Sequence, residues 1–219
     1  MELPSLLRIL RLASPALPIG SYGYSQGLET AIEAGIAEGP EGVERWIGDH
    51  LRLCLGRGDA AYFWRIRRAH DAGDHDAAAR WDEEYLASRG SAELRAEAIQ
   101  MGASLARLVD ALDGWRMVPE LPSLLAAWSF ASSRWGIGPR EALAAWLFSW
   151  AEAQVLAWLK TGNAGQLAGQ ALLVRLCAEI PAIVEASEAM GDDEIQTFAP
   201  GLAVTSFQHE IQDGRLFRS

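Results

Sequence analysis

The sequence has few basic residues and almost no lysine. It holds 19 Lys and Arg against 29 Asp and Glu in 219 residues, which gives a formal net charge of −10, and Lys160 is its single lysine. Proteins that bind nucleic acid without sequence preference need clustered basic side chains to neutralise phosphates. The acidic balance therefore argues against DNA or RNA as a partner.

Cysteine and histidine are also scarce. Cys54 and Cys177 lie in apolar, helix-like stretches and are interpreted as small buried hydrophobic residues rather than as a disulfide or a ligand pair, which favours a reducing compartment. The four histidines and two cysteines form no recognised metal-binding spacing, although His50 and Cys54 stand four residues apart. The sequence thus predicts neither a metal site nor a cofactor.

No targeting or membrane-spanning segment is predicted. Glu2, Arg8 and Arg11 do not fit the basic start and uninterrupted apolar run of a signal peptide. Residues 142–159 are long and apolar enough to resemble a membrane span, but Glu152 lies near their middle, where a carboxylate is costly. We therefore expect a buried helix in a soluble cytoplasmic protein, with no membrane as a partner.

Strand patterns are absent as well, because no run of alternating β-branched and aromatic residues occurs. Half of the residues are apolar, and glycine and proline separate helix-like segments. The prediction is an all-α fold, a single-domain bundle of about ten helices over residues 1–198, followed by a tail of residues 199–219. The predicted helices are 4–13, 25–36, 41–56, 59–71, 75–88, 91–112, 122–135, 139–160, 164–178 and 181–190, with Ser91 and Pro139 as start signals.

Charged residues are concentrated in 41–118, whereas 119–198 is more apolar. This difference predicts that the first region forms solvated helices around central helices from the second. Gly165 and Gly169 stand four apart and predict a close approach between two helices. Lys160, at the end of the most apolar helix, suits the negative end of the helix dipole. Four tryptophans are expected in the interior: Trp128, Trp146, Trp150 and Trp158.

Gly23-Tyr24-Ser25-Gln26-Gly27 matches the G-x-S-x-G pattern of serine esterases of the α/β-hydrolase type. That motif needs a buried strand before the serine, yet the 24 residues before Ser25 include Pro15 and Pro18. The alternative is that Ser25 caps a helix that starts there. We favour the cap over catalysis.

The tail mixes isolated charges with large apolar residues and ends Arg-Leu-Phe-Arg-Ser. It could be a strand or short helix folded back on its own domain. It could instead be a segment that becomes ordered on a partner, with apolar and arginine anchors.

Four segments, in their order along the chain, form a pattern more specific than any one of them. They are Leu17-Pro18-Ile19-Gly20-Ser21-Tyr22-Gly23-Tyr24-Ser25-Gln26-Gly27-Leu28-Glu29; Glu93-Leu94-Arg95-Ala96-Glu97 with Gln100-Met101-Gly102; Trp150, Glu152, Lys160, Gly165, Gln166 and Gln170; and His209, Glu210, Gln212 and Arg215 to Ser219. Together they resemble the UreF family of urease accessory proteins.

The resemblance implies an all-helical homodimer that is not an enzyme. Such a protein binds UreD (also called UreH) and recruits the GTPase UreG to apo-urease for nickel insertion. By the family's pattern the tail orders against UreD, and Phe217 is expected to be exposed until it does. The predicted partner-binding residues are Tyr24, Ser25, Gln26, Glu29, Glu93, Arg95, Gln100, Met101, Lys160, Gln166, His209, Glu210, Arg215, Leu216, Phe217 and Arg218.

Two departures from the family pattern bear on these contacts. The turn after Lys160 lacks the usual proline, and Asp213-Gly214 replaces a Tyr-Ser pair in the tail. The leading hypothesis is a scaffold for urease maturation. The alternatives are the serine esterase using Ser25 and a helical interaction module unrelated to urease.

Overall fold

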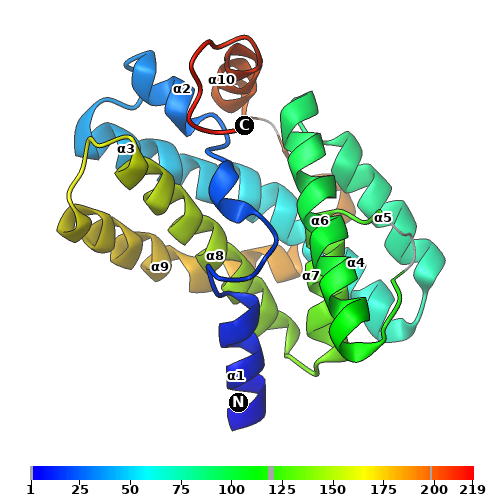
Figure 1. Ribbon diagram of the computed structural model, residues 1–219. Helices are drawn as coiled ribbons and strands as arrows, with labels where there is room; N and C mark the ends of the chain where they lie inside the picture. Colours follow the sequence, from blue (N-terminus) through cyan, green and yellow to red (C-terminus); the bar gives the residue numbers. More distant parts are fainter. Residues whose placement is uncertain (1, 118–120, 198) are drawn as a thin grey trace.

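The computed structural model describes residues 2–117, 121–197 and 199–219, and these ranges contain ten α-helices and no strand (Figure 1). The all-α prediction is confirmed. The side chain of Tyr22 lies outside the described part. The helices are α1 (Leu3–Leu12), α2 (Leu28–Glu33), α3 (Gly39–Asp49), α4 (Ala60–Ala72), α5 (His75–Ala87), α6 (Ala92–Asp113), α7 (Leu124–Arg134), α8 (Pro139–Lys160), α9 (Gln166–Ala189) and α10 (Pro200–Glu210), with short helical turns at Ser21–Gly23 and Asp192–Glu194 and a π-helical segment at His50–Asp59.

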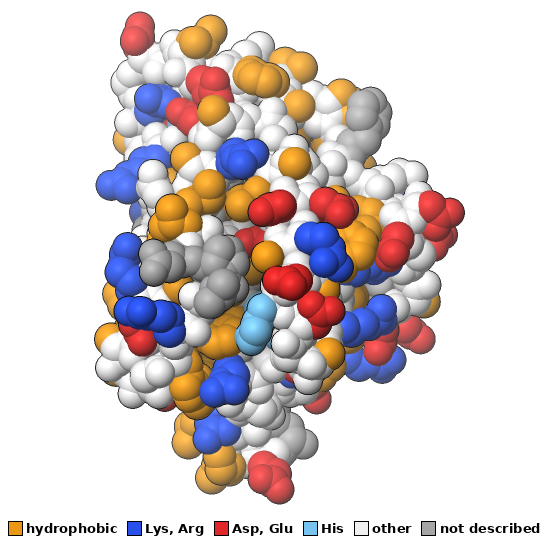
Figure 2. Space-filling view, turned by 90° about the vertical axis from the view of Figure 1, so that its right-hand side faces the viewer, with side chains coloured by type: hydrophobic (Ala, Val, Ile, Leu, Met, Phe, Trp, Pro, Cys, Tyr) orange, Lys and Arg blue, Asp and Glu red, His pale blue; other side chains and the backbone are white. Residues whose placement is uncertain are grey.

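Helix α4 lies at the centre of the molecule. It contacts α5, α7, α8 and α9, and in Figure 1 it runs behind α6 and α7, with α8 and α9 to its left. The central helix therefore comes from the charged region 41–118, not only from 119–198 as predicted. This is possible because its two buried arginines reach acidic partners nearer the surface: Arg65 donates to Asp192 and Arg67 donates to Asp71. Elsewhere the charged region is solvated, and Figure 2 shows both signs of charge scattered over one face.

Helix α3, the π-helical segment and α4 follow one another without the predicted interruption at residues 57 and 58. Glycine allows close approach here rather than ending the helix. A Cβ atom on Gly58 would lie 2.8 Å from Thr197 Cγ2, and one on Gly56 would lie 3.2 Å from Ile183 Cγ2.

Helix α9 is likewise one helix where two were predicted, and Pro181 lies inside it. A proline removes one backbone hydrogen bond and usually breaks a helix. In α9 a buried apolar stripe continues across the proline, so packing keeps the helix intact; it consists of Leu172, Leu176, Ile180 and Val184.

Helix α2 begins three residues later than predicted, so Ser25 is not its N-cap residue. Gln26 and Gly27 both have left-handed backbone conformations, with φ of 52° and 81°, which a right-handed helix cannot include. Ser25 Oγ still accepts from the Glu29 amide at 3.4 Å. The start signals at Ser91 and Pro139 are confirmed.

The predicted close approach of two helices is confirmed at Gly169 alone. A Cβ there would lie 3.0 Å from Leu159 of α8, whereas Gly165 precedes α9 and has no neighbouring atom within 4 Å of such a Cβ. Helices α8 and α9 are both long and apolar enough to cross a membrane by length and composition, and core helices of soluble proteins pass the same test. In α8, more than half of that apolar stretch is buried. Three of the four tryptophans expected inside are buried, and Trp150 is half-buried.

The tail folds back on the body instead of extending into solvent. Helix α10 packs against α2 and α6, and residues 211–219 then return to the start of α2 (Figure 1). Phe217 is only 5% exposed, so the expectation that it lies outside the free protein is wrong. The backbone amides of residues 216–218 find acceptors on the body, and this explains why the segment is ordered here.

Candidate functional site

The tail rests on a group of body residues that we call the tail seat: Gly23, Ser25, Glu29, Glu93 and Glu97. Three of the five are glutamates, supplied by α2 and by the first two turns of α6. Glu93 and Glu97 are four residues apart and therefore share one face of α6. The acidic seat faces a tail that carries Arg215 and Arg218.

Glu29 binds the tail backbone directly. Its Oε1 accepts from the Leu216 amide at 2.8 Å and its Oε2 from the Phe217 amide at 3.2 Å. The Oε2 atom also lies 3.4 Å from His209 Nε2. The side chain of Glu29 is almost fully buried, so it is stabilised by these hydrogen bonds rather than by water.

Glu93 connects helix α10 to the end of the tail. Its Oε2 lies 2.7 Å from Nδ1 of His209, whose side chain is 0% exposed. Its Oε1 accepts from Arg215 at 2.5 Å. His209 thus lies between two carboxylates from different helices, Glu29 of α2 and Glu93 of α6.

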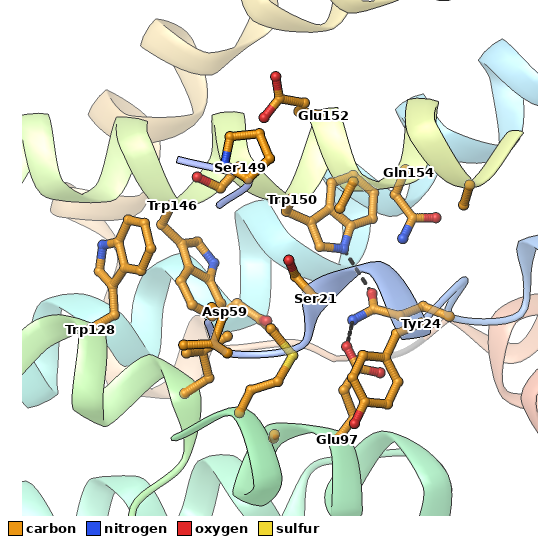
Figure 3. Close-up of a pocket in the computed structure, with 18 of the residues that line it drawn as sticks. Ser21, Tyr24, Asp59, Glu97, Trp128, Trp146, Ser149, Trp150, Glu152 and Gln154 are labelled. Atoms are coloured by element: carbon orange, nitrogen blue, oxygen red, sulfur yellow. Dashed lines mark hydrogen bonds between the residues drawn. The ribbon is translucent and has the colours of Figure 1, made fainter. Parts of the chain in front are cut away.

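Glu97 binds the last residue of the chain. Its Oε2 accepts from Ser219 Oγ at 2.7 Å and its Oε1 accepts from Gln26 Nε2 at 2.7 Å. Trp150 Nε1 donates to the other end of the Gln26 amide at 2.7 Å, and Figure 3 shows this line of hydrogen bonds from α8 to α6. Burial raises the pKa of Glu97 to about 7, although the hydrogen bonds from Ser219 and Gln26 lower it.

The backbone around Ser25 completes the seat. The amides of Ser25 and Gln26 and the Ser25 hydroxyl all donate to the Ser219 main-chain oxygen, at 2.7 to 2.9 Å. The Arg218 amide donates to Gly23 O. Ser25 is 0% exposed and follows helix α1 and turns rather than a strand. The arrangement contradicts the serine esterase alternative, because a nucleophile must be reachable by its substrate.

Phe217 and Lys160 meet at the edge of the seat. The Lys160 ammonium lies 5.2 Å from the centre of the Phe217 ring, within range of a cation–π interaction. Lys160 is therefore next to the tail despite the altered turn that follows it.

A cavity of about 110 Å³ adjoins the seat between α6 and α8. Tyr24, Gln26, Met101 and Lys160 line it, and Figure 3 shows Trp146 and Trp150 reaching into it from α8. In the described part of the chain, three buried polar atoms around it have no hydrogen-bond partner: Trp146 Nε1, Gln154 Oε1 and Arg89 Nε. The cavity can hold water or another small polar group that satisfies them.

The cavity wall contains a buried ion pair that sequence patterns did not reveal. Arg89 Nη2 lies 2.7 Å from Asp59 Oδ1, and Tyr85 donates to Asp59 Oδ2 at 3.2 Å. The Arg89 guanidinium also stacks 4.3 Å from the centre of the Tyr85 ring. Because the pair is 30 residues apart in the sequence and follows no motif, spacing could not have predicted it.

Metal-binding residues do not gather in the described ranges: no group of three or more His, Cys, Asp or Glu is placed to hold an ion. Burial, with the nearby Arg89 charge, lowers the pKa of His50 to about 3. Burial raises the pKa of Cys54 to about 12, so this thiol stays protonated. Both cysteines are free thiols.

The structure brings most of the predicted site residues together and separates a few. Tyr24 donates to Gln100 at 3.0 Å beside the cavity, and Glu210 accepts from the Ala92 amide at the start of α6. Met101 is buried against the cavity and is no surface residue, while Arg95 and Gln166 are exposed and touch no tail residue in the described contacts. Glu97, Ser219 and Trp150 were quoted within the segments, but the sequence did not mark them as site residues.

The chain is similar in sequence to known proteins along nearly its whole length. The sequence model of the UreF family matches residues 37–177. The chain is 46% identical to the urease accessory protein UreF of Azoarcus sp. (strain BH72), over 98% of this chain and 95% of that protein. It is 42% identical to UreF of Janthinobacterium sp. (strain Marseille), over 100% of both chains, and 43% identical to UreF of Methylobacillus flagellatus, over 98% of both.

Proposed function

Since the chain belongs to the UreF family of urease accessory proteins, we propose that it is a scaffold that binds UreD (UreH) through its tail and recruits UreG to apo-urease for nickel insertion in the cytoplasm. Its relatives are named as accessory proteins of an enzyme, and the chain is itself not an enzyme. Membership in this family also argues against the alternative that the chain is a helical interaction module unrelated to urease.

The observation that carries the proposal is the outer face of the tail. While Phe217 and the backbone of residues 216–218 face the seat, large apolar side chains of the tail face solvent, and Ile211 is 84% exposed. The others are Val204, Phe207 and Leu216. Val204, Phe207 and Ile211 are three, four and seven residues apart and so share a helix face, and a group of exposed apolar side chains on an ordered segment is typical of a protein-binding surface. We assign this face to UreD.

Homodimer formation and UreG binding belong to other surfaces. Helix α9 exposes Leu167 and Val174 on one side, next to Gln166 at its start. Residues three, four and seven apart share a helix face, so these two side chains present one apolar stripe to solvent. This stripe supports α9 as the contact between two copies, and the exposed Arg95 and Gln100 of α6 remain candidates for UreG.

Co-purification tests the assignment of the tail. In cells that express UreD with the chain, we expect the double variant Phe207→Ala, Ile211→Ala to retain less than about a tenth of the UreD bound by the wild type, because truncating two hot-spot side chains removes about 2 kcal/mol or more. Helicity is checked by circular dichroism.

The matched control is Leu7→Ala, Leu10→Ala. These leucines are also large apolar side chains that are more than half exposed, but they lie on α1 at the opposite end of the molecule (Figure 1). If the control loses UreD as completely as the tail variant, or the tail variant retains it, the tail is not the UreD surface.

A further inference from the structure

Four side chains form a line of hydrogen bonds from α8 to the end of the tail. Trp150 donates to Gln26, Gln26 donates to Glu97, and Ser219 donates to Glu97. An indole nitrogen can only donate, so Trp150 fixes which end of the Gln26 amide faces it. Gln26 must therefore present its NH₂ group to Glu97, and Oε1 of Glu97 is always an acceptor.

The other carboxylate oxygen has more freedom. Ser219 Oγ can donate to an ionised Glu97, and the same hydroxyl can accept from a protonated Glu97. A proton on Glu97 thus has a place at Oε2, between α6 and the tail. Both forms of the carboxyl group keep their hydrogen bonds, so the difference between them is the burial of a charge.

We propose that Glu97 is a proton-controlled latch for the tail: the protonated side chain holds residues 215–219 on the seat, and ionisation weakens their docking.

The charges around Glu97 support this role. The two groups that donate hydrogen bonds to it, the Gln26 side-chain amide and the Ser219 hydroxyl, are uncharged, whereas the neighbouring Glu93 is paired with Arg215. The cavity beside Glu97 is lined by Asp59 and Arg89, which bind each other, and by Glu152 and Lys160 of α8. On the side of the tail, His209 lies between Glu29 and Glu93. When the hydrogen-bond donors to a buried carboxylate are neutral, no opposite charge offsets the free-energy cost of removing the ionised group from water.

The direction in which pH changes tail docking follows from the different exposure of Glu97 to water in the docked and undocked states. With the tail docked, burial raises its pKa from the ordinary 4.5 to about 7. When the tail leaves, water reaches the carboxyl group and the pKa returns toward its ordinary value. The docked state therefore binds the proton more tightly. Its stabilisation is complete below about pH 4.5 and is lost as the pH rises through about 7.

A strained residue links the latch to the body. Gln26 is the single non-glycine residue with a positive φ, 52°, in the part of the chain that the structure describes. Its amide donates to the Ser219 main-chain oxygen at 2.9 Å. Loss of the tail removes an interaction that holds this strained backbone, so residues 23–27 should loosen together with the tail.

Hydrogen exchange of the isolated full-length chain tests the latch. The protection of the amides of residues 216–218 and 25–26 is measured from pH 5 to 8.5 and corrected for the intrinsic exchange rates. We expect the tail to open at least about tenfold more readily at the upper limit than at the lower one in the wild type. In Glu97→Gln the change is smaller by at least about fivefold, because the amide is neutral at every pH and can still accept from Gln26 and donate to Ser219.

The matched control is Glu152→Gln, which removes a carboxylate from the same cavity without touching the tail. Its pH profile should equal that of the wild type, and the contacts of His209 with Glu29 and Glu93 are left unaltered in all three proteins. If wild type and Glu97→Gln share one profile, or Glu152→Gln flattens it as much, the latch is wrong. A ¹³C titration of the Glu97 carboxyl group in the wild type gives an answer even if the variant misfolds: a midpoint below about 5 overturns the proposal. No partner is present, so the result is independent of UreD binding.

Discussion

The centre of the helical body and the tail seat both contain buried side chains, but they are stabilised by different interactions. Around α4 the contacts are mostly apolar, with Phe63 and Ile66 completely buried. At the seat, Phe217 is the one large apolar side chain of residues 211–219 that is buried, and the other described contacts are hydrogen bonds to carboxylates and to main-chain atoms.

The two regions also treat a buried carboxylate differently. Asp59 of the body is paired with Arg89 at 2.7 Å, so removal of the carboxylate leaves a buried cation. Glu97 of the seat has only uncharged hydrogen-bond donors, so its charge depends on pH. The buried Asp59–Arg89 pair helps to keep the body folded. The Glu97 carboxyl group, whose pKa burial raises to about 7, allows the docking of the tail to change with pH.

The largest expected effect comes from breaking the pair in the body. Asp59→Asn keeps the size of the side chain but leaves the Arg89 guanidinium buried without a counter-charge. We expect the free energy of unfolding to fall by about 3–5 kcal/mol in urea titrations. Asp49→Asn, which breaks the exposed Arg52–Asp49 pair, should lower it by less than about 1 kcal/mol. Equal losses in the two variants would show that the body does not depend on the buried pair.

A good part of this comparison could be predicted from the sequence. The absence of strands follows from the lack of alternating patterns, and the starts of α6 and α8 follow from Ser91 and Pro139, because local hydrogen bonding and proline geometry act within one turn. The functional importance of the tail, and of the segments that contain Glu29 and Glu93, was predicted from the resemblance to the UreF family. The resemblance identified these residues without showing that they touch.

The rest depends on contacts between distant parts of the chain. Glu97 and Ser219 are 122 residues apart, and Asp59 and Arg89 are 30 apart, so no periodic pattern connects them. The continuity of α9 through Pro181 is decided by packing on both sides of the proline, which outweighs a local preference. The exposure of Phe217 was predicted wrongly because its burial depends on backbone hydrogen bonds to Glu29.

The prediction of intermediate size concerns pH. The stability of the body and the docking of the tail should depend on pH with opposite signs. The pKa of His50 is lowered by burial and by Arg89 to about 3, against 6.5 ordinarily, so the unfolded chain takes up its proton first. This contribution to the stability of the body is present above about pH 6.5 and is lost as the pH falls toward 3, whereas the docking of the tail strengthens in acid.

His50→Phe tests this contrast, because it keeps a ring against Trp150 and cannot take up a proton. Between pH 7 and 5 the wild type should lose about 2 kcal/mol more unfolding free energy than the variant. The comparison uses the difference between the two pH values, so a constant packing penalty in the variant cancels. Parallel losses in both proteins would mean that His50 does not set the acid sensitivity of the body.

The smallest expected effect sharpens the description of the seat. Arg215 is about a third exposed and binds Glu93 at its edge, so Arg215→Gln should weaken tail docking by about 1 kcal/mol or less, which corresponds to a fall of up to about fivefold in the protection of the residue 216–218 amides. Arg218→Gln, in the same segment but with an exposed side chain, is the matched control and should change protection by less than twofold, about the size of a neutral surface substitution. Salt should reduce the Arg215 effect, because a partly exposed ion pair is screened while the buried hydrogen bonds of Glu29 and Glu97 are not. An effect of Arg215→Gln that is large and independent of salt would instead make the ion pair, and not the buried carboxylates, the main support of the tail.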